Sequence, residues 1–415
     1  MSEIDVSRIG LWGKLLNVQG QIQEHWFGSF LLNLIGYALI IAPAAFLINR
    51  WRKDPKVQRG EGRFYSLLKM FAIGIVDNNA ALEKAEEGQS SPARSSTSST
   101  TGEDNVVQYY VKLLFCVIGL QASYLTWGVI QERIMTQSYD GQKFTNSQFL
   151  VFVNRILAVV IAFVYINITT QPVHRAPFYK YSYASISNTL SSWCQYEALK
   201  FVSFPTQVLS KASKVIPVML MGKVVSNRTY PLNQYFTAVL LSVGVSLFLL
   251  AADPSSQGKH SVETTVAGVI ILLGYMAFDS FTSNWQSEVF ETYKVSSVQM
   301  MFGVNMFSCI LTVGSLLFRG VFFSSLSFLF DHTDFAFHVT LISICSAVGQ
   351  LFIFQTIQAF GPLVFTLIMT TRQALSILLS CVLFGHELTL QALAGVLVVF
   401  ISLLLRVYFR TQKKK

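Results

Sequence analysis

Residues Phe204–Gly222 read FPTQVLSKASKVIPVMLMG, an apolar run long enough to cross a bilayer that nevertheless holds two lysines, Lys211 and Lys214. The hydrocarbon core of a bilayer is about 30 Å thick, so about 20 residues of helix span it. An ammonium group near its centre costs at least ~3 kcal/mol, and such groups therefore face a bundle interior or a water-filled cavity and mark a substrate path. Because both charges are positive, the run predicts a membrane protein with an anionic substrate.

The composition of the whole chain indicates the same class. Hydrophobic residues make up 52% of the 415 residues, charged residues only 13%, and the mean hydropathy is +0.48. Soluble domains carry more surface charge than this. We predict an N-terminal span at Phe27–Ile48 and ten core spans that begin near Val107, Phe149, Ser182, Phe204, Pro231, Thr264, Val295, Phe335, Gly361 and Leu388. The third core span contains SISNTLSSWCQY and is too polar to face lipid.

The long polar stretch Asn49–Asn105 separates the first span from the core. Its first part is basic and carries seven lysines and arginines: Arg50, Arg52, Lys53, Lys56, Arg59, Arg63 and Lys69. Its Ser/Thr-rich part, Gly88–Asp104, cannot bury a core and is predicted to be disordered. The apolar run Phe64–Val76 is too short to span and is expected on the membrane surface. Since no long apolar run precedes Phe27–Ile48, we interpret that segment as a retained membrane helix, not a cleaved signal peptide.

Basic residues near membrane ends mark the cytosolic side. The second basic cluster is the tail, with Arg406, Arg410 and Lys413–Lys415. Ten predicted helices separate the two clusters, and an even number of crossings puts both on the same side, which fits a cytosolic location. The N-terminus precedes the first cluster by one helix and is therefore expected in the lumen or outside the cell. A cluster that binds anionic lipid fits the same topology. The predicted divisions are 1–48 (lumenal N-terminus and extra helix), 49–105 (cytosolic linker), 106–252 and 264–408 (two five-helix halves) and 409–415 (cytosolic tail).

Internal repetition supports the two halves. Placing Ser213–Gly222 over Thr371–Ser380 aligns Lys214 with Arg372. Nearly the same shift superposes two further pairs of segments, Thr126–Glu132 with Thr282–Glu288 and Glu197–Pro205 with Gln355–Pro362. Halves of five helices each must insert with opposite orientations. Inverted repeats are typical of transporters, whose site lies at the midplane between them.

The repeat also predicts the depth of the charges. Lys214 follows Pro205 by nine residues, roughly 13 Å of helix, and Arg372 follows Pro362 by ten, roughly 15 Å. Because the two helices enter from opposite faces, both charges reach mid-membrane. Two cations at one depth repel unless an anion lies between them, so we predict that Lys214 and Arg372 bind a phosphate or sulfate. Lys211, about one turn away on the same helix face, adds a third donor.

The alternative is an internal salt bridge, for which Asp279 is the obvious partner. We interpret Asp279, Glu132 and Glu197 as bridge or gate residues, because a carboxylate would repel an anionic ligand. Weaker substrate-binding candidates are Arg155, Tyr124, Asn305 and Gln373. Arg155 could instead snorkel to the interface. The other three could bind the base and ribose of a nucleoside or link helices by hydrogen bonds.

Enzyme chemistry has no visible basis in the sequence. It contains no HExxH, P-loop or GxSxG motif. The five cysteines, Cys116, Cys194, Cys309, Cys345 and Cys381, all fall in predicted spans, where they are interpreted as small core residues. We therefore predict a protein that is not an enzyme and has no cofactor and no metal site.

Four stretches resemble the nucleotide-sugar transporter family: Ser191–Lys223, Ala277–Gln286, Ser296–Asn305 and Ile344–Phe354. Within the family they are most similar to members that carry adenosine 3′-phospho 5′-phosphosulfate (PAPS). The resemblance extends from about Lys112 to Tyr408. It implies an all-α polytopic membrane protein with the drug/metabolite transporter fold, ten core transmembrane helices in two inverted five-helix repeats. This chain adds one N-terminal helix.

The resemblance also implies a function. Such a protein would be an antiporter of the Golgi membrane that brings PAPS from cytosol to lumen by alternating access, in exchange for an adenosine nucleotide such as adenosine 3′,5′-bisphosphate. It would supply sulfotransferases. Membrane lipid is a further expected partner, a homodimer is left open, and no nucleic acid is expected. The tail TQKKK does not fit the spacing of a dilysine retrieval signal.

The family's basic motifs on the fourth and ninth core helices fall on Lys211, Lys214 and Arg372. Its motif on the seventh core helix matches as FGVN, ending at Asn305, without the double asparagine of sugar-nucleotide relatives. Gln373 stands where many relatives have a lysine. These departures suit a ligand without a sugar, and a nucleotide-sugar antiporter of the same fold is the alternative.

Overall fold

The computed structural model describes residues 42–74, 102–136, 138–139, 141–144, 146–198, 201–202, 210–211, 213–251, 266–383, 391, 394–395, 397–399, 401–402 and 405. The chain forms two compact units, Met1–Gly74 and Ile75–Lys415. Four described helical segments are long and apolar enough to cross a membrane: Val107–Gln131, Ser147–Ile168, Ser297–Phe318 and Thr333–Arg372. The prediction of a helical, polytopic membrane protein is confirmed at this level.

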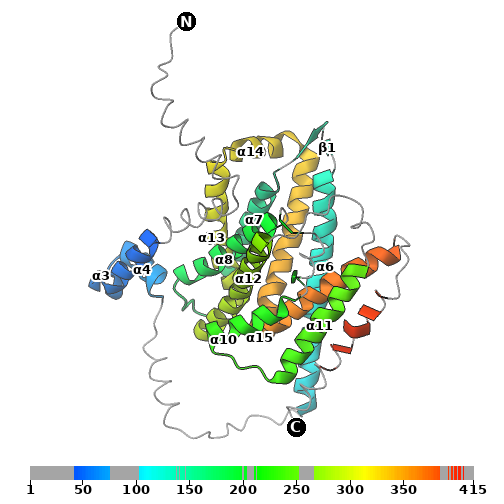
Figure 1. The fold of residues 1–415 in the computed structure, drawn as a ribbon. Coiled ribbons are helices and arrows are strands. Elements are labelled where there is room, and N and C mark those ends of the chain that lie inside the picture. Colours follow the sequence, from blue (N-terminus) through cyan, green and yellow to red (C-terminus); the bar gives the residue numbers. More distant parts are fainter. Residues whose placement is uncertain are drawn as a thin grey trace. The chain divides into compact units, whose positions relative to one another are not determined.

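In the part of the second unit that the structure describes, the elements are helices and one small hairpin (Figure 1). In chain order they are α6 (Gly102–Thr136), β1 (Ser138–Tyr139), β2 (Gln142–Lys143), α7 (Ser147–Ile168), α8 (Tyr179–Ala198), α10 (Val215–Ser226), α11 (Leu232–Ala251), α12 (Val266–Tyr293), α13 (Ser297–Phe318), α14 (Phe322–Asp331) and α15 (Thr333–Leu383).

Most predicted starts of core spans lie close to an observed helix start, from α7 through α15. One boundary was wrong, because α6 begins at Gly102 and includes Gly102–Asp104, which the sequence assigned to a disordered linker. The predicted N-terminal span and the span from Leu388 lie mostly outside the described residues, as do residues 75–101 and the tail.

The predicted break at Gly361 is confirmed. α15 is two helices that meet at Gly361, which has φ 82° and ψ 171°, and Pro362 follows it. Proline has no N–H to donate, and its ring clashes with the carbonyl four residues earlier. Glycine adopts the positive φ without steric cost.

The stretch Phe204–Gly222 is not the single continuous helix that the sequence predicted. Ser213 and Lys214 form a turn, and α10 begins only at Val215. Pro217 explains the break, because it cannot donate to the Ser213 carbonyl, which instead accepts from the Ile216 amide at 3.2 Å. Residues 203–209 lie outside the described part. Lys214 therefore lies at the N-terminus of a short helix and not along the middle of a long one.

Helices of the first half pack against helices of the second. α6 contacts the first part of α15, where the rings of Phe115 and Phe352 lie 5.3 Å apart, and a Cβ at Gly119 would collide with the Phe352 ring. α8 contacts α12, where the Ser187 hydroxyl donates to the Phe278 carbonyl at 2.6 Å. Without a strong hydrophobic force inside lipid, such close packing and hydrogen bonds hold helices together.

α7 and α13 run antiparallel to each other. Their contacts pair the start of one helix with the end of the other, in the order Gln148–Ser315, Arg155–Asn305 and Phe163–Phe302. The first two are hydrogen bonds of 2.8 and 3.0 Å. The middle of each helix therefore lies beside the middle of the other.

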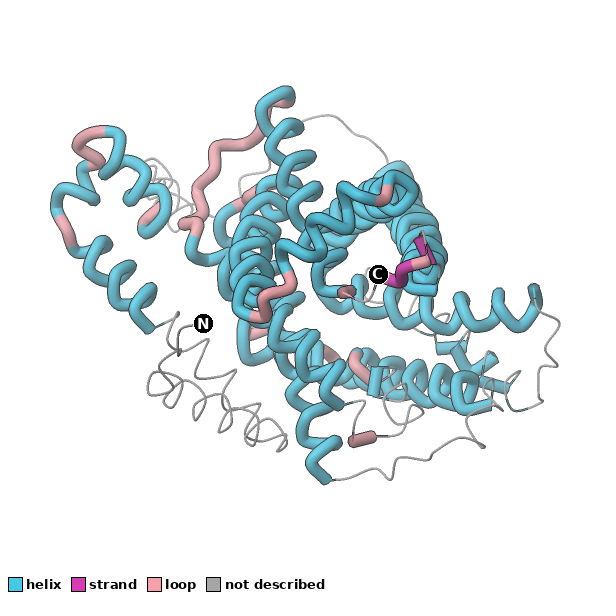
Figure 2. Tube along the Cα trace, turned by 90° about the horizontal axis from the view of Figure 1, so that it is seen from above, coloured by secondary structure: helices cyan, strands magenta, loops and turns pink. Residues whose placement is uncertain are grey.

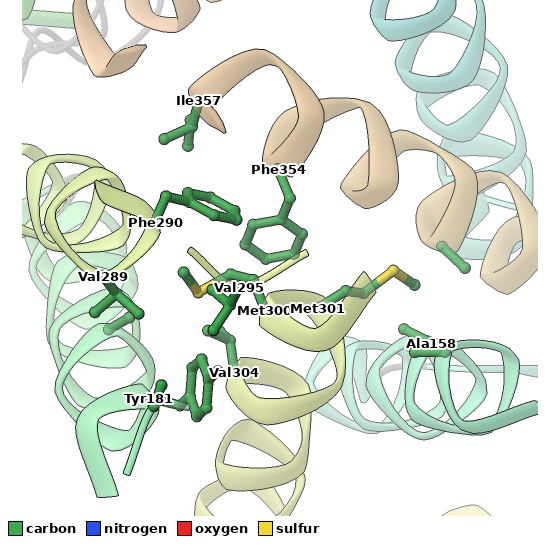
Figure 3. Close-up of a cluster of buried hydrophobic side chains, with 14 residues drawn as sticks. Ala158, Tyr181, Val289, Phe290, Val295, Met300, Met301, Val304, Phe354 and Ile357 are labelled. Carbon is green, nitrogen blue, oxygen red and sulfur yellow. The ribbon is translucent and has the colours of Figure 1, made fainter. Parts of the chain in front are cut away.

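A hydrophobic cluster fills the bundle where α7, α8, α12, α13 and α15 converge (Figure 3). Phe290 of α12 and Phe354 of α15 face each other across it, with Met300 of α13 below them. Tyr181 of α8 is 1% exposed and packs against Gly303, where a Cβ would clash with its ring. This cluster joins helices from both halves.

One end of the bundle, here called the aromatic end, is built from Tyr139, Phe144, Phe149, Phe328 and Phe335. Tyr139 lies in the hairpin, and its ring centroid is 5.2 Å from that of Phe335. Phe149 and Phe335 are both fully buried. Figure 1 shows β1 and α14 at this end, and Figure 2, seen from above, shows the strands in magenta beside the helix ends.

The opposite end, here called the polar end, has contacts that include hydrogen bonds and an ion pair. Arg228, in the loop after α10, pairs with Glu291 of α12 and donates to the Ser287 hydroxyl at 2.9 Å. Gln299 of α13 donates to the Pro172 carbonyl at 2.7 Å. Both sets of contacts join the first half of the helices to the second.

The N-terminal unit contains a helical segment at 42–53 followed by α3 (Pro55–Arg59) and α4 (Arg63–Ala72). The Asp54 side chain accepts from the Lys56 amide and caps α3. The predicted surface run forms α4, which has ten residues and is too short to span. Its Phe64 and Leu67 side chains are exposed.

Candidate functional site

A cavity of about 320 Å³ lies between helices of the two halves. Its volume falls within the range of pockets that hold small molecules. Aromatic and aliphatic side chains form part of the wall, and polar side chains point in from several helices. The lining residues are Tyr124, Trp127, Val151, Asn154, Arg155, Asn188, Lys214, Asp279, Thr282, Ser283, Gln286, Val304, Ser346, Gln350, Ile353, Phe354, Phe365 and Met369.

Lys214 and Asp279 form an ion pair on one wall of this cavity. Lys214 occupies the N-cap position of α10, and Asp279 lies in the middle of α12. The free N–H groups of a helix N-terminus add positive potential there. The side chains are 17% and 25% exposed, so the pair can be reached from the cavity.

Arg155 reaches the same cavity from α7. Its Nη1 donates to Asn305 Oδ1 of α13 at 3.0 Å and to Gln350 Oε1 of α15 at 3.4 Å. The guanidinium therefore points into the bundle, and of the two possibilities left open for Arg155 the structure does not show snorkelling to the interface. Two neutral amides fix its position.

Arg372 lies close to this wall. Its guanidinium carbon is 5.7 Å from the centre of the Tyr124 ring, a cation–π distance. Its Nε is buried and has no hydrogen-bond partner among the described residues. Lys211 lies within electrostatic range of both Lys214 and Arg372. The repeat-related cations are thus near one another.

The structure brings most of the predicted site residues together. Tyr124, Arg155, Lys214 and Asp279 line the cavity, and Asn305 stands behind Arg155. Glu197 lies at the end of α8 and is not part of the lining. The side chains of Gln373 and Glu132 lie outside the described part.

The sequence reasoning missed several polar lining residues. Thr282, Ser283 and Gln286 follow Asp279 along α12 at spacings of three, four and seven residues. Residues at these spacings share one helix face, so the polar stripe could have been found from periodicity. Asn154, which accepts from the Ser343 hydroxyl at 2.7 Å, and Asn188 gave no such signal.

Within the described ranges, no group of three His, Cys, Asp or Glu residues could hold a metal ion. The four cysteines described there, Cys116, Cys194, Cys309 and Cys345, are free thiols. What the cavity offers is binding by cations, amides and aromatic rings.

Residues 112–410 match the UAA transporter family. The chain belongs to the UAA transporter family. It is 53% identical over 396 residues to adenosine 3′-phospho 5′-phosphosulfate transporter 1 of Homo sapiens, covering 94% of this chain and 89% of that protein. The protein of the same name from Drosophila melanogaster is 46% identical over 404 residues, covering 94% and 85%.

A third relative carries a different name. The chain is 37% identical over 311 residues to UDP-galactose/UDP-glucose transporter 5 of Arabidopsis thaliana, covering 73% of this chain and 89% of that protein. The resemblance drawn from the four sequence stretches is thereby confirmed. This chain is a membrane transporter and not an enzyme.

Proposed function

We propose that this chain carries PAPS across the Golgi membrane, from cytosol to lumen, and so supplies sulfotransferases. The observation that carries the proposal is the excess of positive charge around the cavity. Arg155, Lys211, Lys214 and Arg372 lie in or beside it, whereas Asp279 is the one carboxylate among the lining residues described. A phosphate monoester carries about −1.5 to −2 at pH 7. PAPS adds a phosphosulfate to such a group, which suits several cations.

The packing supports the proposed inverted repeats. A two-fold axis in the membrane plane would make equivalent helices run antiparallel, as α7 and α13 do. The same axis would exchange the α6–α15 contact with the α8–α12 contact, and both are present. We propose ten core helices in two five-helix repeats on this basis.

The mechanism is alternating access, in which the repeats rock around a fixed site. In the empty site Asp279 neutralises Lys214. An anionic substrate competes with Asp279 for Lys214, and the remaining cations favour the loaded state. Without a substrate, the unpaired cations of the site disfavour closure of the repeats around it. The carrier therefore returns only with a second anion bound, which enforces exchange against an adenosine nucleotide such as adenosine 3′,5′-bisphosphate.

The orientation follows from the basic clusters. The C-terminal tail and the 49–105 linker are cytosolic and the N-terminus is lumenal, because basic residues are retained on the cytosolic side. This places the polar end of the bundle in the cytosol and the aromatic end in the lumen.

Counterflow of labelled PAPS with the full-length protein in liposomes tests the substrate. We expect adenosine 3′,5′-bisphosphate to compete strongly and adenosine 5′-phosphosulfate to compete poorly, because losing the 3′-phosphate leaves a buried cation unpaired. Strongest competition by a uridine or guanosine sugar nucleotide would overturn the PAPS assignment and leave a transporter with another substrate.

That outcome would favour the second candidate, a nucleotide-sugar antiporter. The relative named for UDP-galactose and UDP-glucose supports this alternative. A UDP-sugar presents a pyrophosphate with no terminal phosphate, so it has fewer charges to place among the four cations.

A further inference from the structure

Arg155 differs from Lys214 in its surroundings. Both of its hydrogen bonds use Nη1 and both acceptors, Asn305 Oδ1 and Gln350 Oε1, are neutral. Among the residues that the structure describes, no carboxylate forms an ion pair with it. The ionisable groups that act on it electrostatically are Tyr124 and Cys309. A tyrosine hydroxyl has an ordinary pKa near 10 and a cysteine thiol one of ~8.5, so both groups are neutral at pH 7.

Lys214 has the opposite arrangement. Its ammonium pairs with Asp279, so the chain itself compensates the charge on that wall. A cation without a counter-ion in a low-dielectric interior is costly, and its retention indicates that a ligand supplies the missing negative charge.

The free part of the Arg155 fork is available to such a ligand. Nη2 and Nε donate to none of the described residues, and the side chain lines the cavity. A guanidinium presents parallel donors that match two oxygens of one phosphate, whereas a lysine is a point charge. Because Asn305 and Gln350 hold Nη1, the remaining donors have a fixed direction.

Tyr124 connects the two positively charged regions. It interacts electrostatically with both Arg155 and Arg372, and its ring lies next to Trp127 at 6.3 Å between centroids. Arg372 in turn lies in range of Lys211. A nucleotide with two separate anionic groups on its ribose would therefore place one group at Arg155 and the other at the cluster of Lys211, Lys214 and Arg372, with Tyr124 near both.

We propose that Arg155 binds the 3′-phosphate of the nucleotide, while Lys211, Lys214 and Arg372 bind its 5′-phosphosulfate. The assignment rests on the proposed function, since it presupposes a nucleotide phosphorylated at both ends. A 3′-phosphate is a terminal group with three free oxygens, which a single guanidinium fork can grip. The phosphosulfate spreads its charge over two groups, which suits separate cations. Arg155 is thus the residue that distinguishes PAPS and its bisphosphate product from nucleotides without a 3′-phosphate.

The test compares two ligands that differ only in that phosphate, AMP and adenosine 3′,5′-bisphosphate. Ligand binding to the folded state raises its stability by RT ln(1 + [L]/Kd), so the thermal shift increases with ligand concentration and with affinity. Purified full-length protein in detergent is titrated with each ligand, and the dissociation constants are derived from the thermal shifts. The variants are Arg155→Gln, the conservative Arg155→Lys and, as a matched removal of one charge from the other region, Lys211→Gln.

We expect the wild type to bind the bisphosphate at least tenfold more tightly than AMP. In Arg155→Gln this ratio falls to about threefold or less while AMP binding is unchanged, and Arg155→Lys keeps part of the preference. Lys211→Gln weakens the binding of both ligands by the same factor and leaves the ratio of their dissociation constants unchanged. If Arg155→Gln weakens the binding of both ligands equally, the ratio of their dissociation constants is unchanged. That result overturns the assignment and identifies Arg155 as structural.

The two proposals can fail separately. If the wild type itself shows no preference for the bisphosphate, the proposed PAPS function fails and the assignment of Arg155 fails with it. If the wild type shows the preference and Arg155→Gln retains it, only the assignment fails. AMP binding reports folding in every variant, so a variant that fails to fold binds neither ligand. If Arg155→Gln fails to fold, the ratio of the two dissociation constants in Arg155→Lys decides whether the assignment holds.

Discussion

The aromatic end and the polar end of the bundle are held by different kinds of contact. At the aromatic end, Phe149 and Phe335 are fully buried among other rings. At the polar end, Arg228 pairs with Glu291, whose side chain is 60% exposed. Burial of large rings contributes several kcal/mol, whereas an exposed ion pair contributes at most about 1 kcal/mol.

This difference suits a protein that opens one end at a time. The polar end can separate at small cost because water replaces its partners, while the aromatic end exposes apolar surface when it separates. In the proposed exchange cycle, we therefore expect the conformation in which the aromatic end is closed to be the more strongly stabilised one. Variants at each end, and in the site between the two ends, test this contrast.

The largest effect is expected from Phe335→Ala. Removing a fully buried ring leaves a cavity, and such changes cost about 3–5 kcal/mol. The free energy of unfolding, or the Tm in detergent, measures the loss. The matched control is Phe323→Ala, because Phe323 is 71% exposed. If both variants lost the same stability, the aromatic end would not be the rigid one.

The second prediction addresses the site while leaving both ends intact. Lys214→Ala or Arg372→Ala should reduce PAPS exchange in liposomes at least tenfold, which corresponds to ~1.4 kcal/mol. Folding and targeting should be normal, because neither side chain belongs to the packing of an end. Lys112, which is exposed on α6, provides the control variant Lys112→Ala. Normal exchange in both site variants would remove these cations from the substrate path.

The sequence predicted what local chemistry determines. The Gly361–Pro362 break follows from one glycine and one proline, and the order of spans follows from hydropathy. The break before α10 was missed although Pro217 indicates it. Pro217 lies inside an uninterrupted apolar run, which hydropathy alone predicts to be one helix. Most starts of spans were therefore predictable within a few residues, except at α6, which begins earlier than predicted, and before α10, where a proline lies inside an uninterrupted apolar stretch.

The site was only partly predictable, because it depends on contacts between distant segments. Lys214, Arg372 and Asp279 could be found as charges inside spans. The orientation of Arg155 depends on Asn305 and Gln350, which come from two other helices. No pattern within α7 indicates those partners. The hairpin and α14 were likewise missed, since strands of two residues carry no periodicity.

A third prediction concerns the polar end. In a double-mutant cycle of Arg228→Gln and Glu291→Gln, the coupling energy should be at most about 1 kcal/mol, because the pair is partly exposed and screened. Either single change should leave the Tm nearly unaltered. A coupling of ~3 kcal/mol would show that this end is held as firmly as the aromatic one.

The fourth prediction uses pH at the polar end. His174, in the loop between α7 and α8, stacks on Phe178 and contacts the Tyr181 hydroxyl at 2.8 Å. Burial lowers the pKa of His174 below its ordinary value of 6.5. Its stabilising contribution is therefore complete above about pH 6.5 and is lost as the pH falls toward the lowered pKa, since the unfolded chain binds the proton more readily.

Thermal unfolding of the wild type and of His174→Gln between pH 7.5 and 5.5 measures this effect. The wild type should lose more stability on acidification than the variant does. Parallel curves for the two proteins would mean that His174 does not report on this end.

The last prediction expects no change at all and tests which end faces the cytosol. The sequons NIT at Asn167 and NRT at Asn227 both lie at the polar end, and both asparagines are exposed. Asn167 also lies within the apolar span Ser147–Ile168, whereas Asn227 lies outside the spans, and we expect its location on the cytosolic side to keep it from the lumenal glycosylation machinery. The electrophoretic mobility of the protein from cells should be the same before and after glycosidase treatment, and the same for Asn227→Gln. A glycan on Asn227 would place the polar end in the lumen and reverse the assignment of both ends.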